Sequence, residues 1–320
     1  MNQTVIGLLH PGEMGAAVGR CLTGRGHTVL WASEGRGPAS TRRAEAAGLT
    51  DAGTAQAVAG RAEVILSVCP PHAAMDVARA VTGFGGLYVD ANAVSPGTAQ
   101  EIATLIAAGG GRYVDGGIIG LPPVTPGQTR LYLSGPHART VSELFTGTAL
   151  DARVISSSPT AASAVKMAYA GWTKGSAALL LAVRALAQAA GVEDTLLAEW
   201  ALSQPSLPGR SLGSARSATA KGWRWIAEME EISASMTAAG LPGGFHEAAA
   251  EIFRRTPRAR TQSAAAEPAG APPPSAEPSS QEPADAAPAS ATADGAAAGA
   301  AATTGDGQSI DTVLAALRRR

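Results

Sequence analysis

Three lysines are the residues of this sequence best suited to acid–base chemistry. Lys166, Lys174 and Lys221 are the only lysines among 25 basic residues. Arginine stays protonated in proteins, whereas a lysine in a pocket can lose its proton. Lys166 lies early in an apolar stretch predicted to be helical, where the helix dipole and desolvation by Val165 and Met167 both disfavour a cation. This setting predicts that Lys166 is a general acid or base.

A glycine-rich turn after the first apolar run, residues 4–10, is the second candidate site. The spacing of G-x-G-x-x-G is kept, but His10 stands in place of the first glycine. Between a strand and a helix, such a turn directs backbone N–H groups at a pyrophosphate. A purely structural turn is the alternative interpretation. The residues expected to bind a dinucleotide here are Pro11, Gly12, Glu13, Met14 and Gly15.

The end of the second strand, residues 27–31, should select the cofactor. Ser33 and Arg36 follow this strand and could hold a 2′-phosphate, which favours NADP. Glu34 would instead favour NAD if it points inward, so NAD stays open as the alternative. Cys69 and Pro70 close the strand predicted at 62–68, at the same edge of the sheet, and are further cofactor-binding candidates.

The elements around these residues alternate between strands and helices. Strands are predicted at 4–10, 27–31, 62–68, 86–90, 112–115 and 130–134. This alternation predicts a Rossmann-type, doubly wound parallel sheet over residues 1–157 that binds NAD(P). Residues 158–255 are predicted to form an all-helical substrate and dimerisation domain, with helices at 159–190, 193–203, 211–239 and 245–255. The 159–190 helix is apolar over much of its circumference, which predicts a homodimer.

The last part of the chain changes character. From 256 to 309 the sequence is rich in Ala, Pro and Ser and contains no large apolar residue, which predicts a disordered linker. Residues 310–320 then resume a helical pattern, because Ile310, Val313, Leu314 and Leu317 make one apolar stripe after Ser309, a good N-cap. So short a helix is marginal alone in water. We therefore expect it to dock in a groove of its own chain or of a partner. A frayed tail without a partner is the alternative interpretation.

Composition and charge narrow the class of protein. The chain has 320 residues, a net charge of −1 and two cysteines. Binders of nucleic acid that act by bulk electrostatics usually need a basic domain, so no nucleic-acid partner is expected. Two cysteines suit a reducing compartment. The apolar stretch 176–190 is too short for a bilayer. We expect a cytoplasmic protein with a small-molecule substrate, no membrane contact and no metal site.

Four motifs, in this order, resemble one family of proteins. They lie at residues 7–15, 89–96, 115–120 and 166–171. The chain resembles the β-hydroxyacid dehydrogenases, the superfamily of 3-hydroxyisobutyrate and 6-phosphogluconate dehydrogenases, over about residues 4–255. Its C-terminal part is most similar to an uncharacterised branch with a phosphogluconate-dehydrogenase-type domain. The resemblance implies hydride transfer with Lys166 as the catalytic residue, and substrate contacts from Asn92, Ser95, Gly117 and Gly120. Capping of the turn is the alternative role of Asn92 and Ser95.

Two departures from the family pattern concern the substrate. The family usually has an asparagine four residues after the lysine and a serine in the second glycine segment, where this chain has Ala170 and Ile119. Tyr169 or Lys174, on the same helix face as Lys166, could compensate. No basic cluster for a sugar phosphate is evident, which disfavours phosphogluconate. Trp223, Trp225, Glu228 and Lys221 are interpreted as helix-packing residues rather than pocket residues.

The sequence thus predicts an NAD(P)-dependent dehydrogenase or reductase acting on a small β-hydroxy acid or related alcohol. An imine reductase is an alternative, although imine reduction usually dispenses with a catalytic lysine. A catalytically inactive NADP-binding sensor or scaffold is the second alternative, because Ala170 and Ile119 replace substrate-contacting residues.

Overall fold

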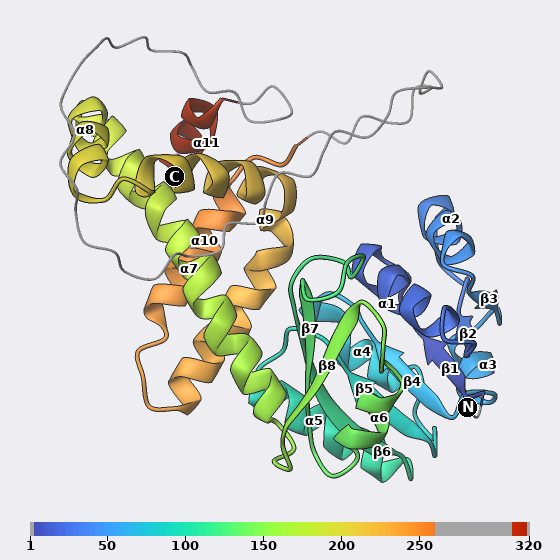
Figure 1. Ribbon diagram of the computed structural model, residues 1–320. Coiled ribbons are helices and arrows are strands. Elements are labelled where there is room, and N and C mark those ends of the chain that lie inside the picture. The colour runs from blue at the N-terminus through green and yellow to red at the C-terminus, as the bar shows by residue number, and fades with distance from the viewer. Residues whose placement is uncertain (1–2, 260–308, 319–320) are drawn as a thin grey trace, which may run out of the picture.

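The computed structural model describes residues 3–259 and 309–318. An α/β domain is followed by an all-helical domain that extends away from the sheet along the long helix α7 (Figure 1). The described residues form one eight-stranded sheet in the order β3-β2-β1-β4-β5-β6-β7-β8. The strands are β1 (Val5–Leu8), β2 (Thr28–Trp31), β3 (Thr50–Asp51), β4 (Val64–Ser67), β5 (Leu87–Asp90), β6 (Arg112–Ile119), β7 (Thr129–Ser134) and β8 (Leu150–Ser156).

The central strands β4 and β5 are buried on both sides because helices cover both faces of the sheet. Successive residues of a strand point to opposite faces, so a strand covered on both sides reads as a continuous apolar run. In β4, Leu66 packs into the core on one face and Ile65 into the core on the other. The covering elements are α1 (Glu13–Thr23), α2 (Pro38–Ala46), α3 (Ala55–Ala59), η1 (Pro71–Ala73), α4 (Ala74–Arg79), α5 (Pro96–Ala108) and α6 (Ala138–Glu143).

The predicted fold class is confirmed, with one reversal of strand direction. The strands pair in parallel throughout except that β7 runs antiparallel to β6. The connection between these two strands, residues 120–128, contains no helix. A connection of this length suits an antiparallel pair, whereas parallel neighbours need a longer crossover. The sequence predicted both strands as members of a parallel sheet, so the direction of β7 differs from the prediction. The strands β3 and β8 were not predicted.

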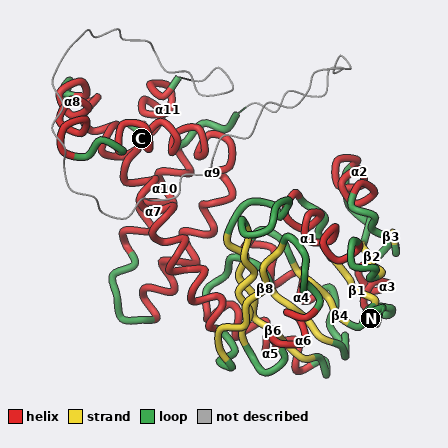
Figure 2. The backbone as a smooth tube through the Cα atoms, in the orientation of Figure 1, coloured by secondary structure: helices red, strands yellow, loops and turns green. Residues whose placement is uncertain are grey.

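The helical domain is built around the long helices α7 and α9 (Figure 2). Small residues bring its helices close together: a Cβ at Gly175 would lie 3.1 Å from the Phe245 ring and 3.3 Å from His246 Nε2. The elements are α7 (Ala161–Ala189), α8 (Glu193–Ser203), α9 (Leu207–Ala238), α10 (Gly244–Arg255) and α11 (Ile310–Leu317). None of the helices in the described residues combines the length and apolar character needed to span a bilayer.

The helix α11 packs on the helical domain of its own chain. The Ser309 side chain caps it by accepting a hydrogen bond from the backbone N–H of Thr312. The predicted apolar stripe is its buried face and joins the core made by α7, α9 and α10. Arg255 Nη1 donates to the carbonyl of Leu317 at 3.2 Å. Most of the predicted linker, residues 260–308, lies outside the described residues, whereas Ala259 donates a backbone hydrogen bond to Thr219 on α9.

Candidate active site

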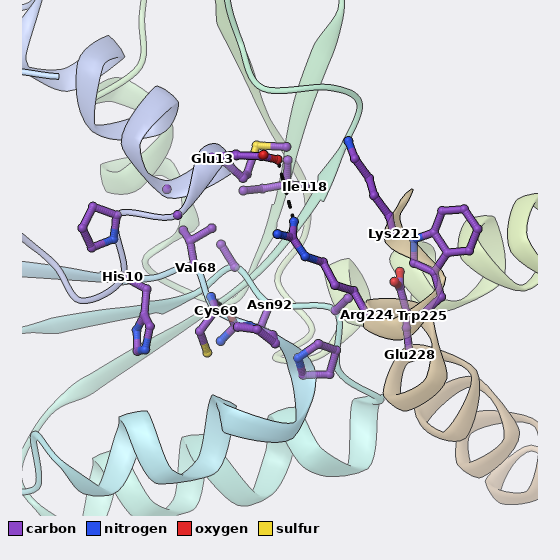
Figure 3. Close-up of a pocket in the computed structure, with 18 of the residues that line it drawn as sticks. His10, Glu13, Val68, Cys69, Asn92, Ile118, Lys221, Arg224, Trp225 and Glu228 are labelled. Atoms are coloured by element: carbon purple, nitrogen blue, oxygen red, sulfur yellow. Dashed lines mark hydrogen bonds and ion pairs between the residues drawn. The ribbon is translucent and has the colours of Figure 1, made fainter. Parts of the chain in front are cut away.

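A cavity of about 400 Å³ lies between the two domains. The glycine-rich turn before α1, the loops after β4 and β5, the end of β6, and helices α7 and α9 contribute to it (Figure 3). Residues predicted from the sequence that line this cavity are Pro11, Gly12, Glu13, Met14, Gly15, Arg36, Cys69, Pro70, Asn92, Gly120 and Lys166. Other predicted residues lie outside its lining: Ser33, Ser95, Gly117, Tyr169 and Lys174.

The glycine-rich turn leaves the amino end of α1 open toward the cavity. No side chain caps this helix, and its N-cap residue is Gly12. A Cβ at Gly12 would meet no atom within 4 Å, whereas a Cβ at Gly15 would lie 2.1 Å from the carbonyl oxygen of His10. Gly15 is therefore required by the turn, and Gly12 leaves space next to free backbone N–H groups. This arrangement fits a pyrophosphate group.

Two neighbouring side chains define the turn further. Arg43 of α2 donates from Nε to the carbonyl of Pro11 at 3.1 Å and so ties α2 to the turn. Burial, together with the Arg36 cation, lowers the pKa of His10 to about 4, so His10 is neutral near pH 7. Arg36 and Ser40 line the cavity beside this turn. The polar and basic groups that could bind the far end of a dinucleotide are thus Arg36 and Ser40.

Ser33 and Glu34 have other roles in this structure. The Ser33 side chain is a hydrogen-bond partner of Asp51, whose pKa is lowered chiefly by the Gly53 backbone N–H. The exposed Glu34 donates its backbone N–H to the carbonyl of Gly53 at 2.9 Å. Both residues therefore link the loop after β2 to the loop after β3.

Asn92 joins the ends of β4 and β5 at the floor of the cavity. Its Oδ1 accepts from the backbone N–H of Cys69 at 2.6 Å, and its Nδ2 donates to Ser67 Oγ at 2.9 Å. Burial raises the pKa of the Cys69 thiol to about 12, with a further contribution from Asp90, so the thiol stays protonated. Ser95 caps α5 instead, and its N–H donates to Glu231 Oε2 at 2.7 Å.

The amino end of α7 is capped by side chains from the sheet. Asp115 in the middle of β6 accepts hydrogen bonds from the backbone N–H and the hydroxyl of Ser163, at 2.9 Å and 2.5 Å. Ser134 of β7 accepts from the N–H of Ala162 at 3.0 Å and donates to Asp115 at 2.9 Å. The residue at the N-cap of α7 itself makes no side-chain cap. The two strands therefore satisfy N–H groups that the helix leaves free.

Lys166 lies about one helical turn after Ala162, and contacts with β6 fix its position. A Cβ at Gly117 would lie 2.9 Å from the carbonyl of Ala162 and 3.0 Å from Lys166 Cβ, so α7 rests directly on this strand. Lys166 Nζ then donates to the carbonyl of Ile118 at 2.9 Å. The glycine predicted as a substrate contact thus supports the helix that carries the lysine.

A buried carboxylate from α9 stands between two of the lysines. Glu228 Oε1 lies 3.7 Å from Lys166 Nζ, and Glu228 Oε2 is hydrogen-bonded to Lys174 Nζ. Burial lowers the pKa of Lys174 to about 8, although Glu228 opposes this shift. Burial would raise the pKa of Glu228, but the two lysines outweigh it and the pKa is lowered. Desolvation is thus the main cause of the lowered pKa of Lys174.

Helix α9 supplies cavity residues that the sequence analysis missed or interpreted as packing. They are Lys221, Trp223, Arg224, Trp225 and Glu228. Arg224 reaches across to Glu13, with 3.8 Å between Nη1 and Oε2 (Figure 3). Trp225 also packs edge-to-face on Phe253, with ring centroids 5.1 Å apart. The signal in the sequence was the grouping of charged and aromatic residues within eight positions.

Comparisons with known proteins agree with this architecture. Residues 187–256 match a family described as Domain of unknown function (DUF1932). None of the curated proteins matches the chain. A solved structure described as a conserved protein of unknown function with structural similarity to 3-hydroxyacid dehydrogenases is 27% identical, with a TM-score of 0.59. The match covers 78% of this chain and 96% of that one.

Two further solved structures are similar in fold. A 3-hydroxyisobutyrate dehydrogenase from Salmonella typhimurium is 19% identical, with a TM-score of 0.61 and coverage of 79% of this chain and 93% of that one. A reductive aminase from Aspergillus terreus, in complex with NADPH and ethyl levulinate, is 20% identical, with a TM-score of 0.51 and the same coverage. The resemblance stated from the sequence is confirmed: this chain has the fold of the 3-hydroxyisobutyrate dehydrogenase-like proteins.

The pH dependence of stability follows from Asp90 at the end of β5. Burial raises its pKa from 3.8 to about 7, with Asp115 and Glu231 adding to the shift and Asn92 opposing it. Its Oδ2 is buried without a hydrogen-bond partner among the described residues. The native state therefore favours the protonated acid. The stability that this group contributes is present below pH 3.8 and is lost as the pH rises through 7.

We predict that Asp90→Asn is stabilising relative to the native protein at pH 8 and close to neutral at pH 4. Asparagine keeps the acceptor for the Asn92 N–H, made at 3.0 Å, and cannot ionise. The difference should grow over this range by as much as roughly 4 kcal/mol. Urea unfolding of both proteins at several pH values measures it. A difference that is constant with pH would contradict the prediction.

Proposed function

We propose that this protein is an NADP-preferring oxidoreductase that transfers hydride between a nicotinamide cofactor and a small β-hydroxy acid or related alcohol. Lys166 is the general acid or base. One observation carries the proposal: the uncapped amino end of α1 and the side chain of Lys166 line the same cavity. A dinucleotide site and a proton-transfer group are thereby brought together, as hydride transfer to or from a C–OH carbon requires.

The cofactor, when bound, supplies the hydride acceptor or donor. The backbone N–H groups at the start of α1 would bind its pyrophosphate, because they are free of side-chain caps and next to Gly12. Arg36 and Ser40 would bind a 2′-phosphate at the ribose end, which supports NADP over NAD. The reductive aminase with a similar fold was solved with NADPH bound.

Lys166 would exchange the proton of the substrate oxygen. Its hydrogen bond to the Ile118 carbonyl fixes Nζ, and Lys166 lines the cavity, so an oxygen atom of a substrate could contact it. Lys221 and Arg224 line the same cavity and are charged groups that suit the carboxylate of a small acid. A small β-hydroxy acid or the matching oxo acid fits these properties.

An imine is the second candidate substrate, because a reductive aminase shares the fold. Oxidation of NADPH by the purified protein, followed across panels of oxo acids, aldehydes and imines, separates the two. Turnover of oxo acids or aldehydes supports the proposal, and turnover of imines alone favours an imine reductase. Cofactor binding without turnover of any compound would favour a non-catalytic sensor or scaffold.

A homodimer formed through α7 is part of the proposal. Trp172 and Leu186 of this helix are 68% and 70% exposed, and Leu179 is 49% exposed. Apolar side chains of this size on one helix are typical of surfaces that pack against another protein. A second copy of the helical domain is the occupant that we propose for this face.

Replacing the lysine should separate chemistry from binding. We predict that Lys166→Ala lowers kcat by about 10²-fold or more, because the group that exchanges the substrate proton is lost. The dissociation constant of NADPH, measured by fluorescence titration, should stay nearly unchanged. Val165→Ala is the matched control, since it truncates the residue next to Lys166 on α7 and lies outside the cavity lining. A loss below about threefold for Lys166→Ala on a good substrate would exclude Lys166 as the acid or base.

Cofactor preference should depend on the arginine beside the turn. We predict that NADPH binds more tightly than NADH, and that Arg36→Ala weakens NADPH binding by about tenfold while leaving NADH nearly unchanged. The charge lost is one that lines the cavity. Arg42→Ala, an exposed arginine of the neighbouring helix outside the cavity lining, is the control. Equal affinities for the two cofactors, or equal effects of Arg36→Ala on both, would reject this assignment.

A further inference from the structure

A carboxylate buried between two lysines is the feature of the site that the reaction described above does not yet use. Glu228 of α9 is in contact with both lysines of α7, which are eight residues apart and therefore on one face of the helix. The side chains of Lys166, Lys174 and Glu228 are 15%, 19% and 6% exposed. Ala170, which lies between the two lysines on α7, is buried and has no polar side-chain atom.

The charges of the three groups do not balance when all three are ionised, because the cluster then holds two cations and one anion. One anion can balance one cation, and a second cation close by in a desolvated site raises the free energy of the cluster. The charged groups that act on Lys174 are Glu228 from α9 and Lys166 from its own helix. A second cavity, separate from the one between the domains, is lined by Lys174 and by Arg210 of α9. As the pH rises, one of the two lysines must give up its proton first.

The contacts of Lys166 favour its protonated form. The hydrogen-bond and ion-pair partners of Lys166 in the described residues are the Ile118 carbonyl and the Glu228 carboxylate, and both are acceptors. Acceptors favour an ammonium group over an amine with a free lone pair. Lys174 has the carboxylate and, at 5.7 Å from the centroid, the ring of Trp225. Its pKa is lowered to about 8, mainly by burial.

We propose that Glu228 is a positioning residue that holds Lys166 as an ammonium ion, so that the site is set for proton donation and hence for reduction of the substrate. This inference rests on the proposed function. In the step it describes, hydride from the reduced nicotinamide forms a C–H bond at a carbonyl carbon. The N–H bond of Lys166 breaks as the O–H bond forms, and water then returns a proton to the amine. Lys174 loses its own proton first and leaves Glu228 to Lys166.

The charge state of each lysine can be measured without cofactor or substrate. The full chain contains three lysines, so NMR of the protein labelled with ¹³C and ¹⁵N in lysine gives a small set of side-chain signals. Lys221→Arg and Lys174→Met assign them. In the native protein, we expect the Lys174 signal to titrate near pH 8 and to change before the Lys166 signal. If Lys166 loses its proton before Lys174, the inference is wrong.

Two nearly isosteric variants test the role of each partner. Glu228→Gln removes the anion and should lower the titration midpoint of the Lys166 signal by about one pH unit or more. Lys174→Met removes the competing cation and should leave that midpoint unchanged or raise it. With a reducible substrate, the pH at which reduction declines should move in the same directions. Equal shifts in the two variants, or no shift in Glu228→Gln, would overturn the inference.

The outcome separates this inference from the proposed function. If the titrations behave as expected and no oxo acid, aldehyde or imine is reduced, the function is wrong. If reduction occurs and the Lys166 midpoint does not respond to Glu228→Gln, the function stands and the role of Glu228 is wrong. The native titration decides the order of proton loss even where a variant does not fold.

Discussion

The position of the catalytic candidate depends on the contact between Asp115 and the amino end of α7. Like every α-helix, α7 leaves the N–H groups of its first turn without partners inside the helix. The side chain of its own N-cap residue does not bind them. The buried carboxylate of Asp115 accepts from Ser163, and Ser134 accepts from Ala162. A negative charge at this end of a helix is favourable, because the helix dipole is positive there. The all-helical domain is thereby fixed to the sheet where Lys166 must enter the cavity.

Neither domain has the complete site by itself. The α/β domain contributes the open amino end of α1 and the basic residues beside it, and the helical domain contributes Lys166 and Glu228. The ion pair between Arg224 and Glu13 links α9 to the first residue of α1 across the cavity. A ligand in this cavity would therefore contact both domains. The buried charges near Lys166 are acceptable only because they are paired, since an isolated buried charge is costly.

Local geometry explains what could be predicted from the sequence. The turn at Gly12 and Gly15 is set by backbone contacts between residues near in sequence, so its spacing identified it. The order of strands and helices followed from apolar runs and their breaks. Lys166 was found because of its place at the start of a long helix. The apolar stripe of α11 was likewise visible in the sequence, because its four apolar residues recur at helical spacing.

Contacts between distant segments explain what could not be predicted. Glu228 is 62 residues from Lys166 in sequence, and no local pattern pairs a carboxylate of one helix with two lysines of another. Gly117 was predicted as a substrate contact, and in the structure it also supports α7. The role of Asp115 in binding the start of α7 was not predicted. Ser95 has the features of an N-cap and is one. The direction of β7 could not be predicted, because the sequence shows only the length of the connection between β6 and β7. The positions of Ser33 and Tyr169 relative to the cavity follow only from the fold.

The central claim is that Asp115 holds Lys166 in place, and the kinetics of Asp115→Asn test it most directly. An amide cannot accept from all three donors that face this carboxylate, so the start of α7 should shift. With a good substrate, kcat should fall by about tenfold or more, while the NADPH dissociation constant changes by less than about twofold. Asp90→Asn, on the neighbouring strand in register with Asp115, is the matched control. An unchanged kcat, or an equal loss of NADPH affinity, would contradict the account.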